Sequence, residues 1–476
     1  AHQMSDSNPA GTDAPGQSAA RRGLRDIGRS LAHRNFRLFF AGQTISLLGT
    51  WMQSTAMIWL VYRLSKEQGR DSAVLLGITN FAGQIPVLFL GLVAGVFSDR
   101  WNRQRIVIAT QALSMIQAFL LGYLTVTHLI TINQLIFLCL CLGCINAFDM
   151  PTRQAFMTEI VDAAADLPNA IAINSSMVNG ARLFGPSIAG IVINLVGEAI
   201  CFLLNGVSFL FVIAALLAMK ITPRPRRASH GSVVGGLHEG FVYAFGFAPV
   251  RAILLLVAMT GLVGMPYVVL LPIFAGDILH GDARTFGFLA GASGVGALSG
   301  SLYLASRSTV VGLGRWIAGT AGTFGLALIA FSFSRHVWLS MPLLCVAGFS
   351  VVVQLASSNT ILQTIVDDQK RGRVMGLYTV AFLGMAPLGS LMAGGLASRI
   401  GTPATVRLGG AVCVLGSVLF ARQLPKIRQI VRPIYAQMGI LPAAAAGIQE
   451  VTERPCLPNT DAVGPAINSH VPDLPI

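Results

Sequence analysis

Residues 95–105 read GVFSDRWNRQR and close a long apolar stretch of the chain. Residues 74–98 carry no charged side chain, and a helix needs about 20 apolar residues to cross the hydrocarbon core of a bilayer. The stretch therefore predicts a membrane span that ends at a cluster of one acid and three arginines.

The composition indicates a polytopic membrane protein. Of the 476 residues, 54% are apolar and only 11% are charged, and the mean hydropathy is +0.67, well outside the range of soluble domains. We predict an all-α membrane protein with twelve transmembrane helices. The predicted spans are residues 36–63, 74–98, 104–127, 132–157, 167–195, 198–219, 251–278, 284–305, 312–334, 337–362, 373–399 and 403–423.

The basic residues predict the orientation. Cytoplasmic loops carry an excess of Lys and Arg, and most of the 33 basic residues fall in cytoplasmic loops if the N-terminus is cytoplasmic. We therefore expect both termini in the cytoplasm and a multi-pass protein of a bacterial-type inner membrane. The net charge of +13 then reflects topology and membrane lipids. It does not indicate nucleic-acid binding, because the basic residues are dispersed over the loops.

A repeat divides the chain into two halves of six helices. Gly91 and Gly95 match Gly296 and Gly300, and the tripeptide IVD at 160–162 recurs at 365–367, both at an offset of 205 residues. Such duplicated halves form a cavity at their interface, and rocking of one half against the other exposes it to alternate sides. The expected parts are a disordered cytoplasmic tail 1–34, a first half 35–220, a cytoplasmic linker 221–248, a second half 249–424 and a disordered cytoplasmic tail 425–476.

The opening stretch resembles the loop between spans two and three of the major facilitator superfamily, Gly-x-x-x-Asp-Arg-x-x-Arg-x-Arg/Lys. The segment GARLFGPSIAG at 180–190 resembles the antiporter motif of that superfamily. The segments at 36–65 and 149–176 are similar to the branch that holds the enterobactin exporter and the macrolide efflux proteins. The resemblance covers roughly residues 35 to 423 and implies the major facilitator fold and an exporter.

The resemblance implies that Asp99 and Arg103 form a latch that holds the cytoplasmic face closed in one state. Asp99 lies at the end of span two, where it can complement the dipole of another helix, and the small faces of Gly91 and Gly95 allow close packing. Arg100 and Arg105 are further members of the predicted gate. For Arg105, a purely topological role under the positive-inside rule is an equal alternative.

Arg182 is a charge near the middle of span five, about 21 Å from its start. A charge at that depth is costly and indicates function. Ser175, Asn179, Arg182 and Pro186 share one helical stripe, which we expect to line the cavity. The alternative is a structural arginine that is bound to backbone carbonyls or to Asp149.

Two further polar groups complete the predicted site. Span one carries a stripe that includes Gln43, Thr50 and Gln53, and Gln354 of the second half matches Asp149 at the repeat offset. We predict that these side chains bind substrate. The predicted substrate-binding residues are Arg182, Asn179, Ser175, Gln43, Thr50, Gln53 and Gln354.

Asp149 allows three interpretations. It could pair with Arg103 or Arg153 as part of the latch, pair with Arg182, or carry the proton that couples export to the gradient, since burial raises the pKa of a carboxyl. The superfamily arginine that is usual in the middle of span four is missing from LIFLCLCLGCINA at 135–147, and this weakens a standard proton relay. Gly185 and Pro186 are the predicted hinge, because proline kinks a helix; a packing kink without directional role is the alternative.

These features predict a secondary exporter of small organic molecules that is driven by protons. Arg182 favours a siderophore or a related anionic metabolite, and multidrug or macrolide efflux is the alternative. A transport-inactive sensor or scaffold is a third class, but we would expect it to carry an added soluble domain. We expect no enzyme, because HExxH, GxSxG and phosphate-loop motifs are missing from the sequence.

We expect no cofactor and no metal. Cys139, Cys141 and Cys144 diverge around a helix and have no evident fourth ligand. The expected partners are the substrate, membrane lipids and protons, with no nucleic acid, and a monomer is our working expectation. The first twenty residues lack the apolar core of a signal peptide, so the first span is expected to direct insertion.

Overall fold

The computed structural model describes residues 29–161, 166–219, 233–307 and 309–438. The side chains of residues 92, 93, 95–100, 233–239 and 437 lie outside this description, and with them the predicted gate residues Gly95, Asp99 and Arg100. The chain divides into the compact units Ala1–Pro425 and Lys426–Ile476, and all contacts described below lie within the first. Most of the expected tails lies outside the described residues.

The first half contains a short 3₁₀ turn, η1 (Arg29–Ala32), followed by six long helices. The helices are α2 (Arg34–Glu67), α3 (Ser72–Arg100), α4 (Arg103–Val126), α5 (Ile132–Ile160), α6 (Leu167–Val196) and α7 (Glu198–Ala218). The connections α2–α3 and α4–α5 are only a few residues long, so consecutive helices run antiparallel. The turn η1, within the expected N-terminal tail, is held to the start of α6, where the Ser30 hydroxyl donates to the Asp166 carbonyl at 2.9 Å.

The second half repeats this order, with two of its spans interrupted by π-helical turns. The seventh span consists of α9 (Ala248–Met259), η3 (Thr260–Gly264), α10 (Tyr267–Ile273) and η4 (Phe274–Ile278). The eleventh consists of α14 (Asp368–Thr379), η5 (Val380–Gly384) and α15 (Met385–Ile400). The other helices are α8 (Val233–Gly246), which lies in the expected linker, α11 (Ala283–Ala305), α12 (Leu313–Phe333), α13 (Val337–Ile365) and α16 (Thr402–Gln437).

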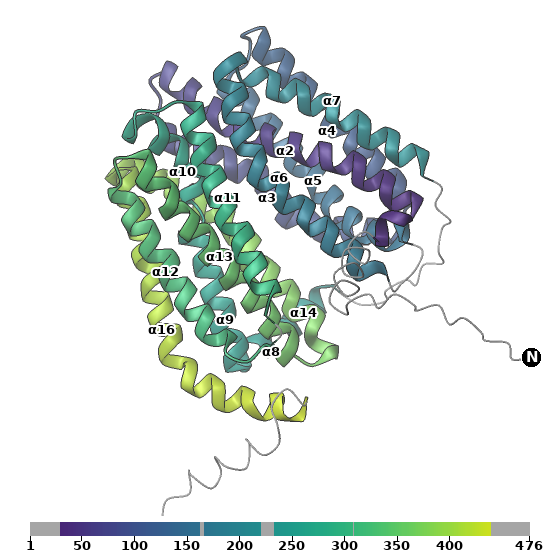
Figure 1. Ribbon diagram of the computed structural model, residues 1–476, viewed down its shortest axis with the longest axis vertical. Coiled ribbons are helices and arrows are strands. Elements are labelled where there is room, and N and C mark those ends of the chain that lie inside the picture. The colour runs from purple at the N-terminus through teal and green to yellow at the C-terminus, as the bar shows by residue number, and fades with distance from the viewer. Residues whose placement is uncertain (1–28, 162–165, 220–232, 308, 439–476) are drawn as a thin grey trace, which may run out of the picture. The chain divides into compact units, whose positions relative to one another are not determined.

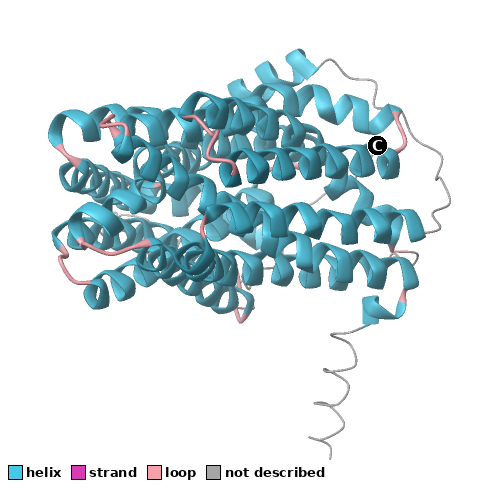
Figure 2. Cartoon of the chain, turned by 90° about the horizontal axis from the view of Figure 1, so that it is seen from above, coloured by secondary structure: helices cyan, strands magenta, loops and turns pink. Residues whose placement is uncertain are grey.

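The predicted all-helical membrane fold is confirmed. The described elements are all helices (Figure 2), and they form eleven spans that are long and apolar enough to cross a membrane. The first predicted span corresponds to α2, which is also long but carries Gln43, Thr50 and Gln53 among its apolar residues. These polar side chains lower its mean hydropathy, which is why it is missing from the eleven.

The predicted repeat is visible in the packing. In the first half α3 lies along α5, and in the second half α11 lies along α13 in the equivalent way. The predicted glycine face is used in the second half, where a Cβ on Gly296 would meet the Cys345 carbonyl oxygen. Its counterpart Gly91 has no neighbour within 4 Å of such a Cβ, so the two faces of the repeat are not used alike in this state.

The two halves meet along two helix pairs that the repeat relates to each other. Helix α6 packs on α11, as Figure 1 shows, and α3 packs on α15. In each pair a glycine from one half faces a glycine from the other. A Cβ on Gly190 would lie 3.0 Å from the Gly287 Cα, and one on Gly77 would lie 3.2 Å from the Gly394 Cα. Backbones can approach this closely only where both side chains are absent.

These glycine contacts lie toward one end of the bundle. We call this the closed end; it contains the last turn of α2 and the first turns of α3 and α11. Toward the opposite, open end the same helices have room. A Cβ on Gly180 of α6, Gly91 of α3 or Gly376 of α14 would have no neighbour within 4 Å. The halves are therefore joined at one end and separate toward the other.

We predict that Gly190→Val weakens the contact between the halves. The added side chain would meet Gly287 and the Ala283 carbonyl oxygen, which lies 2.6 Å from an ideal Cβ, and overpacking costs about 1–3 kcal/mol. Thermal unfolding of the purified protein should show a lower Tm than wild type. The matched control is Gly180→Val on the same helix, where the space is open; equal losses of Tm in both variants would contradict the prediction.

Candidate functional site

Arg182 lies midway along α6, where the two halves meet. Its guanidinium is 6.0 Å from the centre of the Trp51 ring on α2, within the range of a cation–π contact. Its backbone carbonyl oxygen is 3.2 Å from the position of a Cβ on Gly294 of α11. From the second half, the buried Tyr267 hydroxyl lies 2.8 Å from the Ser293 hydroxyl of α11. Arg182 thus lies against an aromatic ring of the first half and the backbone of the second.

Arg182 has no carboxylate within 4.0 Å among the described side chains, and no hydrogen bond from it to a described backbone carbonyl is present. Asp149, the candidate partner on α5, is already paired with Arg153. An arginine within a membrane span is unfavourable unless an anion compensates its charge. The guanidinium of Arg182 therefore retains donors for a ligand.

The predicted stripe on α6 continues from Arg182 toward the open end. Asn179 is partly buried and Ser175 is exposed, although both lie within a span of 30 residues. The structure therefore brings Arg182, Asn179 and Ser175 onto one accessible polar face.

The predicted stripe on α2 divides into two environments. Thr50 is exposed, and its hydroxyl donates to the Ser46 carbonyl at 2.8 Å. Gln53 is only 2% exposed; its amide donates to Gln117 at 2.8 Å and accepts from Asn205 at 2.8 Å. In this state the Gln53 amide joins α2, α4 and α7 within the first half, and Gln43 is buried as well.

In the second half, Gln354 is fully buried on α13. Its amide nitrogen donates to the Thr260 hydroxyl of the π-helical turn η3 at 2.9 Å. A substrate could reach Gln354 only after this bond opens. The π-helical turn is itself a point where the seventh span departs from regular geometry, as helices often do at functional sites.

Of the interpretations of Asp149, the structure shows the pair with Arg153, one turn along α5. The carboxylate also accepts hydrogen bonds from Thr110 at 2.8 Å and Gln111 at 2.9 Å on α4. Asp149 is 1% exposed, so one ion pair and two hydrogen bonds to a single carboxylate oxygen hold this charge in a dry site. Arg103 instead pairs with Glu159 at 2.9 Å.

The remaining predicted gate residues lie on α4 and α6. The side chain of Arg105 is exposed, and its backbone N–H donates to the Asn102 side chain, which caps α4. Gly185 faces the Cβ of Trp51, so it lets α2 approach α6 next to Arg182. Pro186 is buried inside α6, and its carbonyl oxygen would lie 2.5 Å from a Cβ on Gly287.

The closed end carries a polar network that sequence analysis did not find. Asp277, at the end of the seventh span, accepts a hydrogen bond from the Tyr62 hydroxyl at 2.7 Å and pairs with Lys66 at 2.7 Å. Both partners belong to α2, so the network joins the two halves. The ring of Trp59 stacks on Phe286 at 5.8 Å beneath it. The only signal in the sequence was a charged residue at the end of each span, which is common to most loops.

A second cross-half contact lies beside the first. Asn194 of α6 donates to Asp282 at 2.6 Å and accepts from Arg284 at 2.8 Å. Each of these contacts lies at the closed end. The closed end can open only if these contacts break and the two glycine pairs separate.

Within the described ranges, no three His, Cys, Asp or Glu side chains are grouped so that they could hold a metal ion. Cys139 is buried on α5 while Cys141 and Cys144 are partly buried, and all three are free thiols. Their surroundings are those of helix packing.

Two repeated six-helix halves meet at one end of the bundle and hold the cation Arg182 between them midway along it. This arrangement defines a membrane transporter of the major facilitator superfamily. More narrowly, the chain belongs to the family described as transmembrane secretion effectors, MFS_3, whose model matches residues 29–434.

The chain is similar to several bacterial transporters over nearly their whole length. It is 24% identical to the staphyloferrin A transporter of Staphylococcus aureus, covering 82% of this chain and 97% of that protein. It is 26% identical to the multidrug efflux pump Tap of Mycolicibacterium fortuitum, covering 83% and 96%. It is 25% identical to the enterobactin exporter EntS of Escherichia coli O1:K1 / APEC, covering 83% and 93%.

The fold is also found among solved structures. The crystal structure of a bacterial homolog of the human lysosomal transporter Spinster matches with a TM-score of 0.60 at 14% identity, covering 85% of this chain and 98% of that one. The predicted superfamily and its branch are thus confirmed. The relatives named here are transporters and not enzymes.

We predict that Asp149→Asn destabilises the protein by roughly 3 kcal/mol, because removal of one partner leaves the Arg153 charge uncompensated. The measurement is the Tm of the purified protein. The double variant Asp149→Asn/Arg153→Gln should recover part of the loss. An unchanged Tm in the single variant would show that the Asp149–Arg153 ion pair contributes little to the stability of the first half.

We predict that Asp277→Asn favours opening of the closed end by about fivefold, because it removes the Lys66 ion pair and weakens the Tyr62 hydrogen bond. Nitroxide labels at Gln68 and His280, in a background without native cysteines, report the separation as a distance distribution. The matched control is Glu67→Gln, since Glu67 pairs with Arg63 within the same half. Equal distributions in the two variants would contradict the prediction.

Proposed function

We propose that this chain is a secondary exporter that moves a small anionic organic molecule out of the cell by alternating access. Arg182 carries the proposal. A guanidinium presents several donors in a rigid fork that matches carboxylate and related oxyanions, and this one lies in the seam between the halves without an anion among the described residues. Asn179 and Ser175 extend the same face toward the open end.

The aromatic partner of Arg182 refines the proposed substrate. Trp51 supplies flat apolar surface next to the cation, which suits an anion that also carries a ring. We therefore propose a siderophore or a related anionic metabolite. Support comes from similarity to a staphyloferrin A transporter and to an enterobactin exporter.

A multidrug efflux pump is the second candidate. Similarity to the pump Tap at 26% identity over 83% of the chain favours it, as does the apolar composition of the spans. In that case Trp51 would bind lipophilic rings, and Arg182 would contribute little.

We further propose an inner-membrane protein with both termini in the cytoplasm, as the positive-inside rule predicts. In that orientation the open end faces the cytoplasm. Arg103, Arg105 and Arg153, together with Asp99, Arg100 and Gly95, would then form the cytoplasmic latch, and Gly185 and Pro186 the hinge of α6. The parts 35–220 and 249–424 would move as the two rocking halves, with a monomer as the transporting unit.

Proton coupling is proposed on Asp149. The carboxylate is buried, pairs with Arg153 on the same helix and accepts hydrogen bonds from Thr110 and Gln111 of α4, so a shift of α4 against α5 would remove two hydrogen bonds and favour its protonation. Asp149 is therefore proposed both as a latch partner and as the proton carrier. Lys66, Tyr62 and Asp277 would hold the external side closed while the latch is released.

The test is export by cells that lack their own exporters. We expect the protein to lower the accumulation of an iron-chelating catecholate, and Arg182→Ala to reduce this export about tenfold, as expected for the loss of charge-assisted hydrogen bonds. Arg182→Lys should restore part of it, and Arg251→Gln, an exposed arginine outside the seam, is the matched control. A protonophore should abolish export.

Export of a cationic lipophilic dye that is indifferent to Arg182→Ala would instead support multidrug efflux. No export of either compound, with the protein present in the membrane, would overturn the proposal and favour a transport-inactive sensor.

A further inference from the structure

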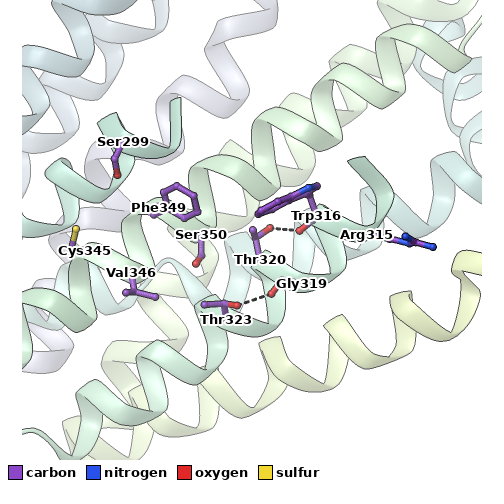
Figure 3. Close-up of a pocket in the computed structure, with 10 residues that line it drawn as sticks. All are labelled: Ser299, Arg315, Trp316, Gly319, Thr320, Thr323, Cys345, Val346, Phe349 and Ser350. Atoms are coloured by element: carbon purple, nitrogen blue, oxygen red, sulfur yellow. Dashed lines mark hydrogen bonds between the residues drawn. The ribbon is translucent and has the colours of Figure 1, made fainter. Parts of the chain in front are cut away.

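A cavity of about 650 Å³ lies in the second half, away from the seam between the halves. Helices α11 and α12 both pack along α13, but they do not pack closely along each other, and the cavity occupies the gap between them. Figure 3 shows its lining. We call it the α12 crevice; residues that define it are Ser299, Arg315, Gly319, Thr323, Phe349 and Ser350.

The lining of the α12 crevice is mostly apolar, and its charge is at one end. Arg315 lies in the first turn of α12 and is exposed. Thr323, at the other end of the crevice, is about 12 Å further along the helix. An apolar groove that reaches from the start of a membrane span toward its middle, with a cation at the start, has the shape and polarity of one phospholipid.

The start of α12 is prepared for an anion. Arg315 has no ion pair with a described acid, and the first turn contains no acidic residue. The N-cap is Gly312, whose missing side chain leaves the first N–H groups of the helix uncapped. The cation Arg315 in the first turn is unfavourable next to the positive end of the helix dipole. A phosphate bound above this turn would compensate both the arginine charge and the helix dipole.

A second arginine strengthens the positive charge at this end. Arg307 lies 5.7 Å from the centre of the Trp316 ring and donates to the Val311 carbonyl at 3.2 Å. It is thereby fixed beside the start of α12. Two arginines and an uncapped helix start thus surround the mouth of the crevice.

Inside the α12 crevice one polar group has no partner. The Ser350 hydroxyl is buried and makes no hydrogen bond, and Ser350 is 1% exposed. Figure 3 shows it among Thr320, Thr323 and Val346. The two threonine hydroxyls are already used, since they donate to the carbonyls of Trp316 and Gly319 at 2.6 and 2.9 Å. Burial of an unpaired hydroxyl is costly, which points to a ligand that supplies the acceptor.

We infer that the α12 crevice binds one anionic phospholipid of the surrounding bilayer, with its phosphate at Arg315 and Arg307 and an acyl chain along Gly319 toward Thr323. An ester carbonyl of the lipid is the acceptor that fits Ser350. Basic pockets between membrane helices recognise anionic head groups in this way. The site does not depend on what the protein exports.

The test is lipid retention by the purified full-length protein in mild detergent, measured by native mass spectrometry during titration with phosphatidylglycerol or phosphatidylcholine. We expect one tightly retained phosphatidylglycerol. Arg315→Gln should weaken its binding about fivefold, the contribution of one arginine near a membrane surface. Arg335→Gln, an exposed arginine beyond the other end of α12, is the matched control and should leave it unchanged.

A second variant tests the crevice without altering charge. A Cβ on Gly319 would have no neighbour within 4 Å, so Gly319→Leu fills the space that the acyl chain needs and leaves the fold intact, which an unchanged Tm confirms. It should abolish the retained lipid. Equal retention of both lipids, an effect of Arg335→Gln as large as that of Arg315→Gln, or a retained phosphatidylglycerol in Gly319→Leu would overturn the inference. Displacement of the lipid by an exported solute would also overturn it.

Discussion

The close approach of two backbones at Gly190 and Gly287, and again at Gly77 and Gly394, is the constraint on which the arrangement depends. Each pair lets one helix of either half cross the other without intervening side chains. Because the repeat relates the pairs, the halves approach each other through glycine at equivalent points of the closed end. Glycine contacts of this kind allow one half to pivot on the other, whereas interlocked side chains would resist motion.

The central cation follows from the same geometry. Arg182 lies on α6 roughly two turns before the Gly190 contact, and its backbone still meets α11 at Gly294. Trp51 reaches it because Gly185 allows α2 to approach. Two kinds of ionic contact thus lie on either side of the site. The ion pair of Asp149 is internal to the first half, and that of Asp277 joins the halves.

Much of this could be predicted from the sequence, for reasons that also show the limit. Apolar runs predicted the spans, because a bilayer demands length and apolarity, and the offset between Gly91 and Gly296 predicted the repeat. Arg182 was predictable, because a charge inside a span is rarely accidental. The stripe on α2 was predicted, but whether Gln53 faces a ligand or Gln117 depends on the neighbouring helix. The chain has 51 glycines, and nothing in the sequence around the four that join the halves distinguishes them from the others. The pairing of Tyr62 with Asp277 spans 215 residues, so it has no local signal in the sequence.

The contact of α2 with α6 also bears on biogenesis. The polar face that surrounds Arg182 makes α6, at a mean hydropathy of 1.2, the least apolar of the eleven spans, and α2 lies outside that set. A helix of this kind partitions weakly from the translocon into lipid. The two helices pack on each other, so each can shield the other's polar face only after both have been synthesised. The emerging α2 must therefore wait for four further segments, and assembly of the first half is completed after insertion has begun.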